Sequence, residues 1–243
     1  MSSLIKSAIY KFLSFLKPGG IVVLMYHSVA DNDEFFTVKP EEFERQMRFL
    51  KKNNFEVTGL EELINLDFES AKNKVILTFD DGYEDNFLNV FPILKKYNFP
   101  ATIFISTDLI GKEIIARKGT KMKILSESQI QEMTKSDIIK FGSHSHRHLK
   151  LSKLSEAEIE RELKTSKEIL EKITGQKIIS LAYPYGNYDE RVKNIATKFF
   201  EISATILKGQ VKNKNQLLEL PRNSIDSKVS FGHFKYIVKI GRI

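Results

Sequence analysis

Two adjacent aspartates, Asp80 and Asp81, lie in the stretch TFDDG at residues 78–82, at the end of an apolar run. Neighbouring carboxylates at the edge of a protein core are costly unless a cation or a proton neutralises one of them. In parallel α/β folds, ligands bind at the C-terminal ends of the strands. The pair is therefore a candidate for metal binding and acid–base chemistry, although a helix cap followed by an Asp-Gly turn would look the same.

A second candidate group comes from the histidines. The chain has five, and three of them are His144, His146 and His148. His144 and His148 are four residues apart, so on a helical turn they would share a face and could bind one metal ion. His146 would point elsewhere, as an outer contact or a surface residue. A solvated loop is the alternative, but the carboxylate pair makes metal binding the preferred interpretation.

Two further features follow apolar runs. The stretch YPYG at residues 183–186 predicts a tight turn that could aim a backbone N–H into a cleft, although alone it would be only a turn. His27 ends the first apolar run, where a histidine is more often a hydrogen-bonded core residue than a catalyst. The remaining histidine, His233, has no obvious partner in the sequence.

These residues need a scaffold of strands and helices. Helical patterns begin at Pro40 and at the capping box of Ser155, and alternate with apolar runs that predict buried strands. The predicted strands are residues 21–26, 75–79, 101–105, 138–141, 178–183 and 202–206, and further helices are predicted at 87–97, 129–135 and 190–199. This alternation predicts an α/β fold with a parallel sheet or barrel.

The composition narrows the class of protein. The 243 residues favour one domain, and 42% hydrophobic with 28% charged residues excludes a disordered chain or a multi-span membrane protein. The absence of cysteine excludes disulfides, thiolate metal sites and cysteine nucleophiles. The net charge of +7 favours anionic neighbours or reflects scattered surface lysines. No basic stripe with interleaved aromatic residues is present, so no nucleic-acid partner is expected.

The N-terminal segment has a helical period of apolar residues. Lys6 and Lys11 interrupt these residues and no small-residue cleavage site follows, so no signal peptide is predicted. Residues 1–20 are expected to form an amphipathic helix that lies on an anionic membrane surface or packs on its own domain. Residues 21–243 are expected to form a single domain. The expected location is the cytoplasm, with the inner face of the membrane as the alternative.

The order of TFDDG, His-x-x-x-His and YPYG resembles the polysaccharide deacetylase family, the NodB-homology group or carbohydrate esterase family four. The resemblance covers residues 74–188, and the stretch LMYHSV at residues 24–29 is similar to the poly-N-acetylglucosamine deacetylase branch. It implies a distorted, incomplete (β/α) barrel. It also implies metal-dependent removal of N-acetyl groups from an N-acetylhexosamine in a cell-surface polysaccharide, an oligosaccharide or a lipid-linked sugar.

The resemblance also implies roles for individual residues. Asp81, His144 and His148 would bind one divalent metal ion, for which two imidazoles and a carboxylate suit zinc, with cobalt, nickel or iron as alternatives. Asp80 would be the catalytic base that deprotonates a metal-activated water. The metal and the backbone N–H of Tyr185 would hold the oxyanion.

The proton for the amine leaving group would come from His27, with His233 as the alternative that other members of the family use. One position departs from the wider family, because Ala182 stands where an arginine usually orients the base; Arg222 is the candidate replacement. The chain also lacks tryptophan, so a different residue must line the pocket for the acetyl methyl group.

Two other functions stay open from the sequence. The fold could serve as a non-catalytic glycan-binding module, although pure binding needs no base beside a metal. The same site could also remove O-acetyl or formyl groups. The oligomeric state is not predictable from the sequence.

Overall fold

The computed structural model of the chain describes residues 20–68, 71 and 73–241. The predicted N-terminal helix lies, apart from Gly20, outside the described residues, so the helix and its contact with a membrane surface stay predictions. Among the described residues, no helix combines the length and the apolar character needed to cross a bilayer.

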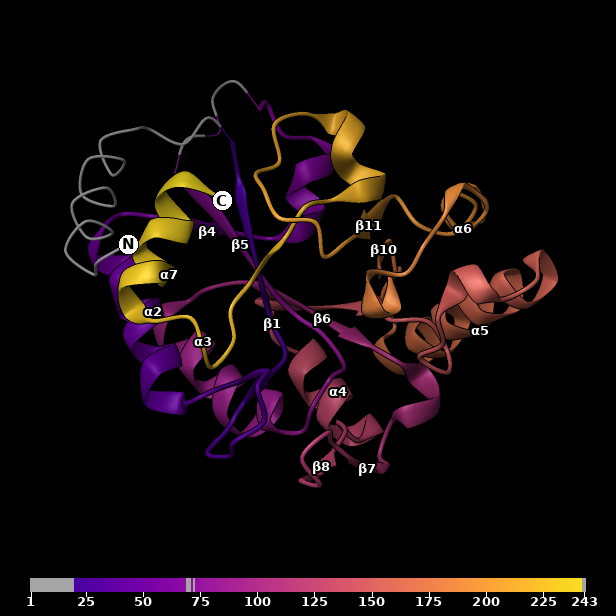
Figure 1. Ribbon diagram of the computed structural model, residues 1–243, viewed down its shortest axis with the longest axis horizontal. Coiled ribbons are helices and arrows are strands. Elements are labelled where there is room, and N and C mark those ends of the chain that lie inside the picture. Colours follow the sequence, from indigo (N-terminus) through magenta and orange to yellow (C-terminus); the bar gives the residue numbers. More distant parts are fainter. Residues whose placement is uncertain (1–19, 69–70, 72, 242–243) are drawn as a thin grey trace.

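An eight-stranded sheet forms the centre of the fold, and all its neighbouring strands are parallel. The strands follow the order β11-β10-β9-β6-β5-β1-β12, and β4 also pairs with β5 (Figure 1). Their bounds are β1 Val22–Tyr26, β4 Glu56–Thr58, β5 Lys74–Phe79, β6 Ala101–Ile105, β9 Ile139–Ser143, β10 Ser180–Ala182, β11 Ile202–Ala204 and β12 Asn223–Ser224.

One short segment, residues 220–224, connects the two ends of this curled sheet. Leu220 forms a parallel bridge with Ala204 of β11, and Asn223 pairs with Leu24 of β1. The sheet therefore closes into a small, irregular barrel. This confirms the predicted distorted (β/α) barrel.

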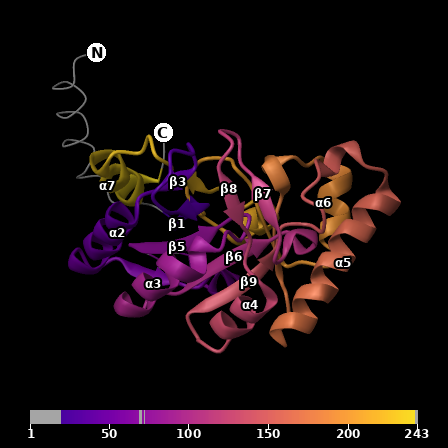
Figure 2. The same cartoon turned by 90° about the horizontal axis from the view of Figure 1, so that it is seen from below.

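Helices cover the outside of the barrel (Figure 2). They are α2 Pro40–Lys52, α3 Phe91–Tyr97, α4 Glu127–Thr134, α5 Glu156–Thr174, α6 Glu190–Ala196 and α7 Phe231–Ile240. Proline in the first turn and two following glutamates favour the start of α2, and Ser155 with Glu158 forms the predicted capping box of α5. The predicted helix at residues 87–97 divides into a π-helical turn, η2 Asn86–Val90, and α3.

The central strands β1 and β6 are buried along their whole length because both of their faces are covered. Val22 and Leu24 of β1 belong to the large cluster beneath the helices, whereas Ile21 and Val23 belong to a second cluster on the opposite face. A strand buried on both faces has a continuous apolar run rather than an alternating one. This explains why six strands were predictable as apolar runs, whereas the short strands β4 and β12, which lack such a run, were not predicted.

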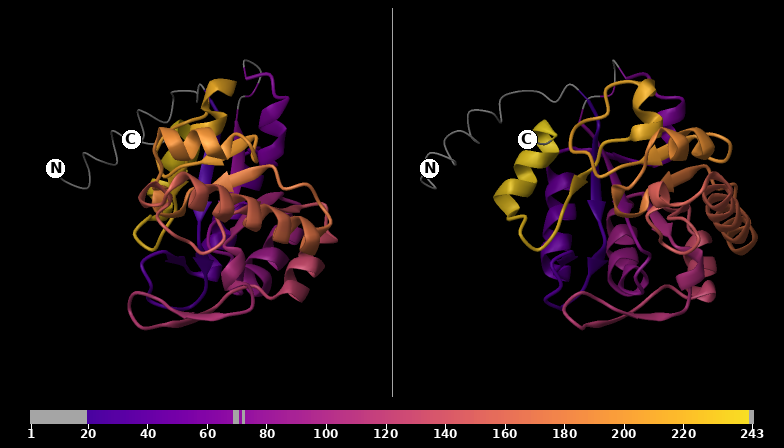
Figure 3. Two further views of the ribbon diagram at one scale, coloured as in Figure 1. Left: turned by 90° about the vertical axis from the view of Figure 1, so that its right-hand side faces the viewer. Right: turned by 45° about the vertical axis from the view of Figure 1, so that its right-hand side comes forward.

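Short elements surround the C-terminal ends of the strands. β2 Ser28–Val29 pairs with β3 Thr37–Val38, and the antiparallel hairpin β7 Glu113–Ile115 and β8 Lys121–Lys123 projects beyond the sheet (Figure 3). The remaining single turns are η1 Leu60–Ile64, η3 Thr107–Leu109, η4 Leu151–Lys153, η5 Pro184–Gly186 and η6 Lys214–Glu219. The hairpin and the loop before β3 form the side walls of the site described next.

Candidate active site

The fold brings five of the six predicted site residues to the C-terminal ends of neighbouring strands. Asp80 and Asp81 follow β5, His27 follows β1, His144 follows β9, and Tyr185 lies just beyond β10. His148 joins them from the loop after β9. All six line one pocket of about 430 Å³.

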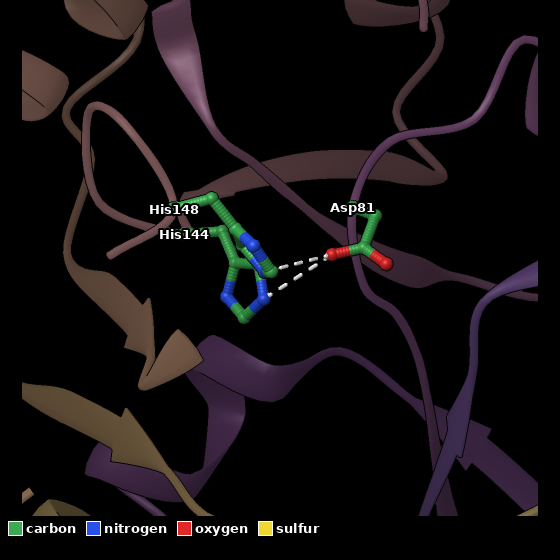
Figure 4. A group of neighbouring side chains, drawn as sticks. All are labelled: Asp81, His144 and His148. Carbon is green, nitrogen blue, oxygen red and sulfur yellow. Dashed lines mark ion pairs between the residues drawn. The ribbon is translucent and has the colours of Figure 1, made fainter. Parts of the chain in front are cut away.

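Asp81, His144 and His148 form a compact group of potential metal ligands (Figure 4). Asp81 Oδ1 lies 3.4 Å from His144 Nε2 and 3.2 Å from His148 Nε2, and the three ligand atoms lie within 4.8 Å of one another. Burial acts to raise the pKa of Asp81, but hydrogen bonds from the two imidazoles outweigh it and hold the pKa well below its usual range. The carboxyl group is thus an anion that faces two imidazole nitrogens.

The expectation that His144 and His148 share a helical turn is wrong. Both residues lie in a loop, in which Ser145 and His148 adopt left-handed backbone conformations with φ of 63° and 57°. The loop turns back on itself through two hydrogen bonds, from the Ser145 N–H to Ser143 Oγ and from the His148 N–H to Ser145 Oγ. His146 points away from the group, and its Nδ1 lies 2.8 Å from Thr107 Oγ1.

The outer nitrogens of the two imidazoles have fixed partners. His144 Nδ1 lies 2.8 Å from the Ala182 carbonyl and donates its hydrogen to it, which turns Nε2 towards Asp81. His148 Nδ1 contacts the Tyr185 hydroxyl at 3.1 Å, which also leaves Nε2 towards Asp81. Such outer hydrogen bonds orient histidine ligands in metal sites. Two imidazoles and one carboxylate on one side of an open pocket therefore fit a divalent metal ion.

Asp80 forms a buried ion pair with Arg222, whose side chain is fully buried. Arg222 Nη1 donates to Asp80 Oδ1 at 2.6 Å and Nη2 donates to Oδ2 at 2.7 Å. Arg222 is itself held by the Thr205 carbonyl at 3.0 Å and by Thr78 Oγ1 at 3.2 Å. Burial acts to raise the pKa of Asp80, but the charge and hydrogen bonds of Arg222 outweigh it and lower the pKa below its usual value.

The arginine therefore reaches Asp80 from the segment that closes the barrel, rather than from position 182. The side chain of Ala182 is a single methyl group, so β10 cannot supply this contact. Arg222, which the sequence offered as a candidate, holds both oxygens of the carboxylate in a bidentate pair.

Tyr185 has a left-handed backbone with φ of 60°, and the next residue, Gly186, has φ of 62°. A Cβ atom at position 186 would lie 2.3 Å from Ile206, so only glycine fits there. Tyr185 lines the pocket, where the resemblance assigns its backbone N–H to the oxyanion.

The two candidate proton donors lie in different places. His27 lines the metal-site pocket, and its carbonyl accepts a hydrogen bond from Asn86 Nδ2 at 2.9 Å. His233 lies on α7 and lines a separate pocket of about 190 Å³, together with Lys208 and Lys228. Of the two histidines, only His27 is positioned at the metal site.

One wall of the pocket was not predicted from the sequence. Phe35, Phe36 and Tyr83 contribute aromatic rings to this wall, and Ile114 and Arg117 contribute from the β7–β8 hairpin. The two adjacent phenylalanines in an otherwise polar loop were a usable signal. Nothing in the sequence connects the hairpin with the site.

The sequence and the fold are similar to those of known proteins. A model of the polysaccharide deacetylase family matches residues 68–199. A Bacillus subtilis protein provisionally named as a polysaccharide deacetylase, YxkH, is 31% identical over 222 residues, which cover 90% of this chain and 76% of that protein. The poly-β-1,6-N-acetyl-D-glucosamine N-deacetylase of Staphylococcus aureus is 32% identical over 173 residues, which cover 67% of this chain and 58% of that protein.

The crystal structure of a polysaccharide deacetylase from Bacillus cereus superposes with a TM-score of 0.79 at 31% identity. The superposition covers 90% of this chain and 69% of that one.

Proposed function

Because the chain belongs to the polysaccharide deacetylase family, we propose that it hydrolyses the acetamido group of an N-acetylhexosamine in a glycan. The products would be acetate and a sugar with a free amine. The staphylococcal relative is named for this reaction on poly-β-1,6-N-acetylglucosamine, which makes that polymer and its oligosaccharides the first substrates to test. Lipid-linked N-acetylated sugars are the second class.

Asp81, His144 and His148 would hold the metal ion that this reaction uses, with zinc as the proposed ion. When bound, a divalent ion at this position acidifies a water molecule and polarises the amide carbonyl. The fixed outer partners of the two imidazoles, Ala182 and Tyr185, keep their Nε2 atoms turned towards the ion position.

Asp80 is the proposed general base. Arg222 keeps its carboxyl group ionised and fixes its plane, while each oxygen retains a free lone pair that can take a proton from the attacking water. The backbone N–H of Tyr185, which lines the pocket, would donate to the carbonyl oxygen as negative charge develops there. His27 would then protonate the departing nitrogen from its ring, so that the C–N bond breaks with a neutral amine as the leaving group.

The single observation that carries this proposal is the placement of an ionised Asp80 next to the metal-ligand group in one pocket. A glycan-binding module would have no use for that base. Acetate release from N-acetylglucosamine oligosaccharides is the direct test. We expect Asp80→Asn to reduce the rate by at least about 100-fold, as for the loss of a general base, while the exposed control Asp137→Asn keeps full activity.

Two results would count against the proposal. Equal acetate release by Asp80→Asn and the wild type would show that Asp80 is not the base. Acetate release from O-acetylated but not from N-acetylated sugars would assign the site to ester hydrolysis instead.

A further inference from the structure

The pairing of strands in the main sheet stops just before His27. The register of β1 with β5 ends at Tyr26 and Phe79, and the Tyr26 carbonyl accepts a hydrogen bond from the Asp80 N–H at 2.9 Å. His27 is the next residue and belongs to no strand. The place of its ring at the metal site therefore depends on what holds the backbone that follows β1, residues 27–29.

A carboxylate that does not line the metal-site pocket holds this backbone. Oδ2 of Asp85 accepts a hydrogen bond from the Ser28 hydroxyl at 2.7 Å, and Oδ1 accepts one from the Val29 N–H at 2.9 Å. Asp85 itself is absent from the lining of the pocket. Its two oxygens thus hold the two residues that directly follow His27.

Two asparagines of the π-helical turn η2 hold the same backbone. Asn86, a fully buried residue, donates from Nδ2 to the His27 carbonyl at 2.9 Å and to Oδ1 of Asp85 at 3.0 Å. Asn89 donates from Nδ2 to the Val29 carbonyl at 2.8 Å. We call Asp85, Asn86 and Asn89 the η2 clamp. Single π-helical turns occur frequently at functional sites.

The η2 clamp belongs to the chain segment that also carries Asp81, one of the potential metal ligands. Asp85 lies four residues after Asp81, and the Asn86 N–H donates to the Tyr83 carbonyl at 2.9 Å, which folds the connection into a compact turn. The pairing of β2 with β3 forms a separate two-stranded sheet. The clamp, in contrast, attaches β2 to the segment that carries the metal ligand, so it ties the place of His27 to that of Asp81.

We propose that Asp85 is a positioning residue for the proton donor. With Asn86 and Asn89, it holds the His27 ring where the ring can protonate the departing nitrogen. A general acid must lie within hydrogen-bond reach of the atom that it protonates, and a displacement of about 1 Å can slow a reaction by about 100-fold. The proposal rests on the proposed function, because it takes His27 as the proton donor, and it extends the site to a residue outside the pocket.

Acetate release from N-acetylglucosamine oligosaccharides by the metal-loaded full chain tests this role. Asp85→Ala removes both acceptor oxygens and should lower kcat by about tenfold or more with KM nearly unchanged, because Asp85 does not line the pocket. Asp85→Asn should restore most of the rate, since its amide oxygen can accept from Val29 and the Ser28 hydroxyl can turn to accept from its nitrogen. Asn89→Ala removes one contact of the clamp and should have a smaller effect in the same direction.

A double-mutant cycle separates positioning from a general loss of structure. In the His27→Ala background, Asp85→Ala should cause no further loss of rate, because the group that it positions is gone. Asp189→Ala is the matched control. Asp189 is also partly buried and accepts a backbone N–H, that of Val192 at 3.0 Å, but it lies at the start of α6 and does not line the pocket. This variant should keep the wild-type kcat.

The place of the His27 ring can also be followed without turnover. The chain has five histidines, so single His→Ala variants assign the NMR signals of their ring Cε1–Hε1 groups. The His27 ring lies 5.9 Å from the Phe36 ring between centroids, which makes its signal sensitive to a small displacement. We expect Asp85→Ala to shift or broaden the His27 signal, and Asp189→Ala to leave it unchanged.

Two results would overturn the positioning role. One is an unchanged His27 signal in Asp85→Ala, and the other is an equal loss of rate from Asp85→Ala in the wild-type and His27→Ala backgrounds. A wild type that releases no acetate from any N-acetylated sugar would instead overturn the proposed function. The NMR comparison would then still decide whether Asp85 holds His27 in place.

Discussion

Replacement of Arg222 by methionine tests the buried ion pair between Arg222 and Asp80, the proposed base. Methionine is apolar and roughly fills the arginine stem, so the main change is the loss of the positive charge from a position that is fully buried. The Asp80 carboxylate then loses the hydrogen bonds to both of its oxygens. Loss of one partner from a buried ion pair costs about 3–5 kcal/mol, because the other charge stays buried and unpaired.

That loss is a large share of the stability of an ordinary domain, about 5–15 kcal/mol. For a chain of this size it corresponds to a fall in Tm of about 10 °C. The double variant Asp80→Asn/Arg222→Met contains no lone charge, so we expect it to be more stable than Arg222→Met alone by about 2 kcal/mol.

The loss of stability should also depend on pH. In the wild type, folding lowers the pKa of Asp80. The ionised carboxylate therefore stabilises the fold at pH values above the unfolded pKa of about 3.9. This stabilisation is lost as the pH falls through the folded pKa. In Arg222→Met, burial acts unopposed and raises the folded pKa above about 3.9. The variant therefore gains stability relative to the wild type as the pH falls. The difference in free energy of unfolding should be largest near pH 7 and should shrink towards about pH 4.

Urea unfolding followed by far-UV circular dichroism measures these differences, because the chain has no tryptophan to report by fluorescence. A chelator in every sample removes the contribution of bound metal. A difference between the wild type and Arg222→Met that stays constant from pH 7 to pH 4.5 would refute the reasoning, because the cost would then come from packing and not from the unpaired carboxylate.

Three further predictions concern the metal group and the proton donor. His144→Ala should reduce the metal content from about one divalent ion per chain to near zero, measured by plasma mass spectrometry, whereas His146→Ala should retain the ion because His146 contacts Thr107 instead. Tyr185→Phe removes the hydroxyl that contacts an imidazole ligand and should weaken zinc affinity by about tenfold in a competition titration with a chromophoric chelator; unchanged affinity would show that this contact does not orient the ligand. His27→Ala should slow acetate release by about 100-fold or more, while His233→Ala should have little effect; the reverse order would assign the proton donor to α7.

Residues of the candidate site were predictable where they directly follow a strand that can be recognised from its own apolar residues. Asp80 and Asp81 end a run of buried residues, and His144 and Tyr185 follow two others. Because the C-terminal ends of parallel strands meet at one edge of a sheet, the prediction of a parallel fold already placed these motifs together. The order of the motifs TFDDG, His-x-x-x-His and YPYG then indicated the polysaccharide deacetylase family.

Other features depend on contacts that are remote in the sequence or on unusual backbone conformations. The i,i+4 spacing of His144 and His148 suits a helix, yet the structure achieves the same convergence with left-handed residues that are not glycine, for which the sequence has no signal. Arg222 lies 142 residues from Asp80, so composition and periodicity could not place it. The resemblance showed that an arginine was missing from its usual position, and Arg222 could be named only as a candidate replacement.

The position of Arg222 connects the chemistry of the site to the closure of the barrel. Arg222 lies between Leu220, which bridges to β11, and Asn223, which pairs with β1, so the segment that carries its guanidinium is bonded to both ends of the sheet. We expect that opening of either pairing would move the charge that lowers the pKa of Asp80 away from its carboxylate. The proposed base would then depend on the pairing of this segment for its ionisation and its orientation. An arginine on β10, in the middle of the sheet, would not create this dependence.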